Sequence, residues 1–176
     1  QIFLKLECFQ YTGTFKARGA LSVAYHIPDA HKSNGITAAS AGNHAIAAAW
    51  AAAVFGLSAK VVMQSTANPF RVKMARSQGA ELVIKEPGAP TFAEAERLVK
   101  EEKRTFIHPF EGIHTSLGTA GVGLELMEDI QNLDAVIVSC GGGGLISGVA
   151  SAVKLIKPSC KFFGVEPIGA DSMSKS

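Results

Sequence analysis

Short apolar runs alternate with longer amphipathic segments along almost the whole chain, and this alternation limits the possible folds more than any other feature. The apolar runs are rich in β-branched and aromatic residues and cover residues 3–7, 35–39, 60–64, 81–85, 105–108, 135–139 and 161–166. Helical patterns cover residues 14–27, 43–55, 69–78, 91–102, 116–130 and 145–156. Strands and helices in alternation predict βαβ units with parallel strands. The sequence therefore predicts an α/β protein.

Composition excludes several other classes of protein. Hydrophobic residues make up 47% of the chain and charged residues 18%, which is typical of a folded domain and not of a disordered one. The net charge is +2 without a dense basic run, so we expect no nucleic-acid partner. The richest apolar run, residues 45–57, is too short to span a bilayer, so we expect no membrane partner. The three cysteines lack CxxC spacing, which favours a reducing, cytoplasmic location.

The two ends of the chain interrupt the pattern. Gln1-Ile2-Phe3 lies inside an apolar run and no initiator Met precedes it, while Ser174-Lys175-Ser176 gives no stop signal. We therefore expect the chain to be a fragment of a longer protein.

Lys16 lies where an apolar run gives way to a helical segment, in Gly13-Thr14-Phe15-Lys16-Ala17-Arg18-Gly19-Ala20. A lysine between Phe15 and small residues is expected to be partly desolvated, which lowers the preference of the amine for its charged form. A neutral amine is a nucleophile that can form a Schiff base. Since the chain has 12 lysines and most lysines are surface residues, Lys16 needs a second feature to be a catalytic candidate.

That second feature is the glycine tract Gly141-Gly142-Gly143-Gly144, which follows a buried-looking strand and opens a helix near Leu145. Glycines at such a junction let backbone N–H groups approach an anion, and the helix N-terminus adds partial positive charge. A tight turn or a flexible linker is the structural alternative, but four glycines exceed what a turn needs. The tract therefore predicts a phosphate site.

The phosphate could belong to more than one cofactor. Gly142-x-Gly144-x-x-Ser147 departs from the dinucleotide pattern at its last position, yet Glu166 ends the next strand where a ribose-binding acid would lie. A nicotinamide-dependent oxidoreductase is therefore an alternative interpretation.

A third strand-to-helix junction reads Ser40-Ala41-Gly42-Asn43-His44-Ala45. Its small residues and exposed amides can form a nest for a carboxylate, and Asn43 can donate to a ring oxygen. A plain helix N-cap and a structural histidine are the alternatives. Because ligands of open α/β sheets bind outside the carboxyl ends of the strands, we expect all three junctions to serve one site.

Six phrases, in this order and spacing, resemble one family. The chain is similar to the threonine/serine dehydratase group of pyridoxal-phosphate enzymes, which shares its fold with tryptophan synthase β chains and serine racemase. The resemblance spans essentially the whole chain and rests on Leu4-Lys5-Leu6-Glu7, Gly13-Thr14-Phe15-Lys16-x-Arg18-Gly19-Ala20, Ser40-Ala41-Gly42-Asn43-His44-Ala45, His108-Pro109-Phe110, Gly141–Leu145 and Gly164-Val165-Glu166-Pro167.

The resemblance implies a role for each matching position. Lys16 is the catalytic residue, which holds pyridoxal 5′-phosphate as a Schiff base and moves the Cα proton. Phe15 packs beside the cofactor ring, and Asn43 bonds its 3′-oxygen. The phosphate binds the amides of Gly141, Gly142, Gly143, Gly144 and Leu145. The substrate carboxylate binds the loop formed by Ser40, Ala41, Gly42, Asn43 and His44.

The resemblance also implies the fold and the reaction. The expected fold is the α/β, fold-type-II, tryptophan synthase β-like architecture of two three-layer αβα domains with open, mostly parallel sheets. The large cofactor-binding domain comprises residues 1–33 and 108–176, incomplete at both ends, and residues 34–107 form an inserted small domain. The expected enzyme is an ammonia-lyase that converts L-threonine, L-serine or a related β-hydroxy amino acid to a 2-oxo acid and ammonia. Relatives commonly form homodimers or homotetramers.

Alternatives within and beyond this family stay open. An amino-acid racemase or a β-replacement enzyme would share the fold, and a truncated chain could be inactive. Serine racemases place a second serine where this chain has Ala41, and alanine cannot transfer a proton, so elimination is favoured. Some relatives bind a divalent cation, for which Glu166 and Ala170 match, while Ser172 stands at the expected aspartate position. Oxygen ligands there would suit Mg²⁺ or Ca²⁺.

Overall fold

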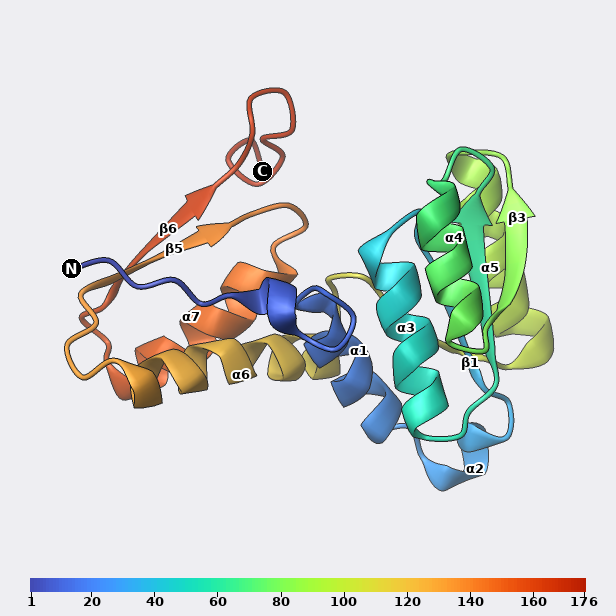
Figure 1. The fold of residues 1–176 in the computed structure, drawn as a ribbon, viewed down its shortest axis with the longest axis horizontal. Helices are drawn as coiled ribbons and strands as arrows, with labels where there is room; N and C mark the ends of the chain where they lie inside the picture. The colour runs from blue at the N-terminus through green and yellow to red at the C-terminus, as the bar shows by residue number, and fades with distance from the viewer. The chain divides into compact units, whose positions relative to one another are not determined.

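The computed structural model describes residues Gln1 to Ser176 and divides them into two compact units. The four-stranded unit comprises Glu7–Pro109, and the two-stranded unit comprises Gln1–Leu6 with Phe110–Ser176. Figure 1 shows the helices and strands of both units. All strand pairs in both sheets are parallel, as the alternating pattern predicts.

The four-stranded unit contains one sheet with the strand order β3-β2-β1-β4. Its strands are β1 (Ile36–Ala39), β2 (Ala59–Gln64), β3 (Glu81–Lys85) and β4 (Thr105–Phe106). Its helices are the 3-10 turn η1 (Glu7–Phe9), α1 (Lys16–Tyr25), α2 (Asp29–Lys32), α3 (Asn43–Val54), α4 (Pro69–Ser77) and α5 (Ala89–Glu102).

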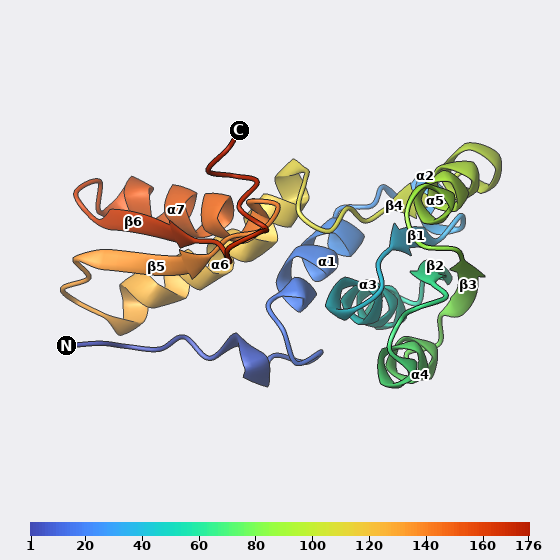
Figure 2. The ribbon, with the colours of Figure 1, turned by 90° about the horizontal axis from the view of Figure 1, so that it is seen from above.

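Helices cover both faces of this sheet. One core joins β1 and β2 to the alanine-rich α3, with Ala75 of α4 and Ala20 and Ala24 of α1. A second core packs Ala95 and Leu98 of α5 on the opposite face (Figure 2). Since both faces are covered, β1 is buried at all four positions, which explains why its sequence does not alternate.

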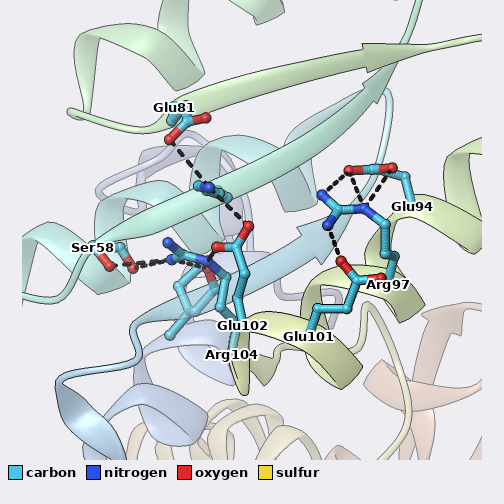
Figure 3. Close-up of polar contacts among 9 residues, drawn as sticks. Ser58, Glu81, Glu94, Arg97, Glu101, Glu102 and Arg104 are labelled. Atoms are coloured by element: carbon cyan, nitrogen blue, oxygen red, sulfur yellow. Dashed lines mark hydrogen bonds and ion pairs between the residues drawn. The ribbon is translucent and has the colours of Figure 1, made fainter.

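An ion-pair network supports the edge of this unit at the start of its strands. Lys60 Nζ lies 2.9 Å from Glu102 and 3.8 Å from Glu81, so it joins β2 to α5 and β3 (Figure 3). Arg104 donates to Glu102 at 2.8 Å and to the Ser58 hydroxyl at 3.1 Å. The network lies at the strand ends opposite the loop that joins β1 to α3, and we assign it a structural role.

The two-stranded unit contains α6 (Ile113–Asp129), β5 (Ala135–Ser139), α7 (Gly144–Ile156) and β6 (Lys161–Val165). Val122 and Leu126 of α6 and Val149 and Val153 of α7 share one core with β5 and β6. The opposite face of the strands is exposed, with Ile137 at 73% and Phe163 at 52%. This sheet is therefore covered by helices on one face.

The strand expected at residues 3–7 was wrong. Residues 1–6 form no strand and Glu7 begins η1, because no strand of the two-stranded unit pairs with this segment. Ile2 and Leu4 are exposed, and Lys5 instead forms ion pairs with Glu125 and Asp129 of α6. The sequence also gave no sign of α2, which is only four residues long.

The other predicted elements are confirmed to within a few residues at their ends. None of the helices has the length and apolar character needed to cross a bilayer. The structure groups residues 7–33 with 34–109, because α1 packs in the same core as α3. The division into a large and an inserted small domain concerns the longer family protein and stays a prediction.

Candidate functional site

Lys16 is the first residue of α1, which follows the turn at Gly13. Its Nζ donates to the carbonyl oxygen of Pro109 and lies 5.0 Å from the centroid of the Phe15 ring. Burial lowers the pKa of the Lys16 amine from its usual 10.5, and a helix N-terminus also disfavours a cation. The amine is therefore desolvated in the way that the sequence predicts for a nucleophile.

A buried ion pair fixes the segment that leads to Lys16. The Arg18 guanidinium donates to both carboxylate oxygens of Glu7, at 2.7 and 2.8 Å. Both side chains are largely buried, with 13% and 17% exposed. A bidentate pair of this kind restrains geometry as well as adding energy. It holds the turn between η1 and α1 closed, directly before the lysine.

The Ser40–His44 loop joins the end of β1 to the start of α3. The N–H of Gly42 donates to the Ser40 hydroxyl at 3.1 Å, which orders the loop. The N–H groups of Asn43 and His44, in the first turn of α3, have no acceptor within the chain, and the Asn43 side chain is exposed. The loop therefore offers backbone donors at a helix N-terminus, where an anion is favoured.

The His44 side chain points away from this surface. It is 4% exposed, and its Nε2 lies 2.8 Å from the carbonyl oxygen of Ile107. Because a carbonyl only accepts, Nε2 carries the ring proton. Burial lowers the pKa of His44 from 6.5 to about 4, so the ring is neutral at physiological pH. Only the backbone N–H of His44 is therefore available to bind an anion.

The depressed pKa makes His44 a source of acid sensitivity. An unfolded chain protonates His44 near pH 6.5 and the folded chain only near pH 4, so its contribution to stability is full above pH 6.5 and is lost as the pH falls towards 4. Between pH 7 and 5 we expect the parent to lose roughly 2 kcal/mol more unfolding free energy than His44→Gln. Urea unfolding of both proteins at the two pH values measures this, and equal losses would contradict it.

Arg71 is a neighbour of the loop that the sequence interpretation missed. It lies in the first turn of α4, and a Cβ built on Gly42 would come within 2.1 Å of its Nη1. The guanidinium therefore lies directly on the backbone of Gly42, where it has no carboxylate partner within the chain. Its position in the sequence could have indicated this contact. Arg71 follows Asn68-Pro69 after the carboxyl end of β2, and β2 is the neighbour of β1 in the sheet.

The glycine tract lies between the end of β5 and the start of α7, in the two-stranded unit. Gly143 has a φ of +80°, which favours glycine, and it caps α7. The N–H groups of Gly141 to Gly144 donate to no other residue of the chain. A Cβ built on Gly141 meets nothing within 4 Å. The tract therefore offers unused N–H donors at a helix N-terminus.

Two contacts fix the path of the tract. A Cβ on Gly144 would lie 2.5 Å from the carbonyl oxygen of Phe110, so only glycine fits there. The buried Thr119 hydroxyl donates to the Gly144 carbonyl oxygen at 2.8 Å. Leu145 packs its side chain against the core of the unit, which leaves its backbone as the part that could meet a ligand.

Glu166 follows β6 and binds its own loop. Its carboxylate accepts the N–H groups of Met173 at 2.8 Å and Ser174 at 3.0 Å, and these bonds lower its pKa. Ala170 lies in the same loop, and Asp171 pairs with Lys175. No group of three or more His, Cys, Asp or Glu side chains in residues 1–176 could hold a metal ion. A set built on one glutamate and a carbonyl stays a prediction.

Parallel α/β units with open loops at the carboxyl ends of their strands define a class of α/β enzymes that bind ligands at those ends. A family model described as "Pyridoxal-phosphate dependent enzyme" matches residues 1–176, and the chain belongs to this family. This assignment replaces the nicotinamide interpretation of Gly141–Gly144. Within the two-stranded unit the unused N–H groups of the glycine tract fit a phosphate group, and within the four-stranded unit the desolvated amine of Lys16 fits a carbonyl group.

Individual relatives agree with the family. The chain is 52% identical over 172 residues to a phenylserine dehydratase of Ralstonia pickettii, covering 98% of this chain and 53% of the relative. It is 40% identical over 179 residues to a catabolic L-threonine dehydratase of Staphylococcus aureus, covering 99% and 51%. Maize serine racemase superposes with a TM-score of 0.94 at 37% identity, covering 97% and 52%. The chain thus spans about half the length of these relatives.

Proposed function

We propose that the protein is an ammonia-lyase that converts a β-hydroxy α-amino acid, such as L-threonine, L-serine or phenylserine, to a 2-oxo acid and ammonia. The similarity to two dehydratases, at 52% and 40% identity over nearly the whole chain, is the observation that carries this proposal. The desolvated amine of Lys16 supports it, since elimination needs a base and a lowered pKa favours the neutral, basic form of the amine.

Each loop has a task in the proposed enzyme. Lys16 attaches the cofactor, Phe15 packs beside its ring, and Asn43 donates to its ring oxygen. The N–H groups of Gly141–Gly144 and Leu145 bind the phosphate. The Ser40–His44 loop binds the substrate carboxylate through the Ser40 hydroxyl and the backbone N–H groups. Pyridoxal phosphate, when bound, supplies a ring that accepts the electron pair left at Cα.

The residues of this chain then perform the proton transfers. Lys16 Nζ removes the proton from Cα, and the bond from Cβ to the hydroxyl oxygen breaks, so that a double bond forms between Cα and Cβ. The hydroxyl group leaves as water with the proton that Lys16 took from Cα, so the lysine amine returns to its neutral form. The released enamine becomes an imine, and one water molecule hydrolyses it to the 2-oxo acid and ammonia. Overall, the amino acid loses one ammonia.

Ala41 favours elimination over racemisation. Racemisation needs a second proton donor on the face of Cα opposite the lysine, and the Ala41 methyl group cannot donate one. A racemase is nevertheless the second candidate, because maize serine racemase is similar to the chain over 97% of its length. Chiral chromatography of the L-serine reaction separates the two, and D-serine formed as fast as the oxo acid would favour the racemase. Failure to take up any cofactor would instead indicate an inactive chain.

Arg71 tests the proposed carboxylate site. Arg71→Gln removes a guanidinium that lies on Gly42, and a charged hydrogen bond contributes about 1.5–3 kcal/mol. We expect KM for L-threonine to rise about 10- to 100-fold, with the absorbance of the bound cofactor unchanged. Arg76→Gln is the matched control, since Arg76 lies on the same helix and is exposed. Equal KM values in both variants would exclude Arg71 from substrate binding.

Assembly and location also stay proposals. We propose that the protein forms a homodimer or homotetramer and acts in the cytoplasm, as the resemblance to the dehydratases and the three cysteines without CxxC spacing suggest. A cation at Glu166 and the Ala170 carbonyl would have oxygen ligands, which suit Mg²⁺ or Ca²⁺, and it would need further ligands beyond these two.

A further inference from the structure

His44 and Lys16 are joined through a three-residue segment, Ile107-His108-Pro109, that follows β4. His44 Nε2 donates to the carbonyl oxygen of Ile107 at 2.8 Å, and Lys16 Nζ donates to the carbonyl oxygen of Pro109. All of these residues belong to the four-stranded unit. The two side chains that the sequence singles out for chemistry therefore bind one short piece of backbone.

The side chain of Ile107 packs in the core and the His108 ring contacts Phe106, whereas the backbone of Ile107 and Pro109 makes few other hydrogen bonds. β4 is an edge strand of two residues, which pairs with β1 only through Thr105 and Phe106. Beyond it, the N–H of Ile107 donates to Thr37 at 2.9 Å, and then the ladder ends. Pro109 has no N–H with which to anchor itself. The imidazole of His44 therefore pairs with the buried carbonyl of Ile107, two residues before the Pro109 carbonyl that Lys16 contacts.

The imidazole is well suited to this task. It is 4% exposed, and Ile107 is fully buried, so water does not compete for the hydrogen bond. The ring stays neutral with its proton on Nε2, because burial and electrostatic interaction with Lys16 and His108 lower its pKa. Without this donor, the Ile107 carbonyl would be buried and unpaired, a state that proteins avoid.

We propose that His44 is a positioning residue for Lys16, which acts by fixing Ile107–Pro109 so that the Pro109 carbonyl holds the lysine amine in place. The proposal rests on the proposed function for its link to catalysis, and on the two hydrogen bonds alone for its effect on the lysine. The imidazole of His44 does not touch the substrate, and only the backbone N–H of His44 belongs to the proposed carboxylate site. Its effect reaches the reaction through the backbone of Ile107–Pro109.

Two variants separate positioning from packing. His44→Leu fills the site without a donor, whereas His44→Gln places an amide N–H near the position of Nε2. We expect the leucine variant to lower kcat at least about 10-fold with KM changed little, because positioning errors cost rate and not affinity. We expect the glutamine variant to recover most of that loss.

A second measurement does not depend on activity. The amine of Lys16 is labelled with acetic anhydride in the protein without cofactor, and mass spectrometry follows its rate against exposed Lys100 in the same sample. We expect the Lys16 rate to change several-fold in His44→Leu and to stay near the parent rate in His44→Gln, with Lys100 constant. If the Lys16 labelling rate differs between His44→Leu and His44→Gln but the parent releases no oxo acid, the positioning role is supported and the proposed function is rejected.

Two results would overturn the proposal. Parent-like labelling and kcat in His44→Leu would show that Lys16 does not need this hydrogen bond. Equal losses in both variants, in step with a lower melting temperature, would make His44 a core residue only.

Discussion

Replacing Lys16 by alanine is expected to remove the absorbance band of the lysine-bound cofactor and to lower 2-oxo acid release by at least about 10³-fold, since a general base alone supplies about 10²- to 10⁴-fold. The reason is that Lys16 has two tasks, to attach the cofactor and to move the Cα proton. No other lysine shares its setting at the start of α1, with the amine on the Pro109 carbonyl and near the Phe15 ring. Visible absorbance and a coupled oxo-acid assay measure both effects.

The matched control is Lys100→Ala, which removes an exposed lysine of α5. It should leave the absorbance band and the rate at parent values. A Lys16→Ala protein that still forms the band and still releases oxo acid would show that another amine carries the cofactor.

Gly144→Ala is expected to destabilise the two-stranded unit and to weaken cofactor binding. Alanine in a helix gains about 1 kcal/mol over glycine, but the added Cβ would lie 2.5 Å from the Phe110 carbonyl oxygen and 2.8 Å from the Phe110 Cα. Backbone atoms cannot move aside cheaply, and overpacking costs about 1–3 kcal/mol. We therefore expect the cost of the steric clash to exceed the gain in helix propensity. The net result is a lower unfolding free energy and at least about 10-fold weaker binding of pyridoxal phosphate.

Gly141→Ala makes the comparison specific. A Cβ there meets nothing within 4 Å, so its unfolding free energy should change by less than about 1 kcal/mol. Urea unfolding and titration with pyridoxal phosphate give both quantities for both variants. The account of the glycine tract is wrong if Gly144→Ala proves as stable as Gly141→Ala and binds the cofactor as the parent does.

The strands and helices were largely predictable because their signals are local. The strand predicted at residues 81–85 is confirmed as Glu81–Lys85, and the helix opened by Asn68-Pro69 begins at Pro69, as the capping signal requires. The apolar run at residues 3–7 carried the same local signal and failed. A strand needs a partner, and partner identity is a property of the folded chain and not of a seven-residue window.

The site was predictable to the level of loops and not of side chains. The glycine tract and the Ser40–His44 loop lie at the carboxyl ends of parallel strands, as βαβ patterning implies. The direction of the His44 ring depends on its hydrogen bond to the carbonyl of Ile107, which is 63 residues away in the sequence. Arg71 was missed because its contact with Gly42 joins two different βα loops. Contacts of this kind arise from packing, for which no sequence window holds the information.

The most direct test of the proposed function is one proton NMR time course of the protein with pyridoxal phosphate and L-threonine, followed by chiral separation of the remaining amino acid. It reports substrate loss, oxo-acid formation and D-allo-threonine, the epimer at Cα, together, with ammonia assayed in the same sample. We expect 2-oxobutanoate and ammonia in equal amounts, matching the threonine consumed, with little D-allo-threonine. Consumption of threonine without 2-oxobutanoate, or conversion mainly to its epimer, would contradict the proposed elimination. The proposed elimination is also wrong if none of threonine, serine and phenylserine reacts.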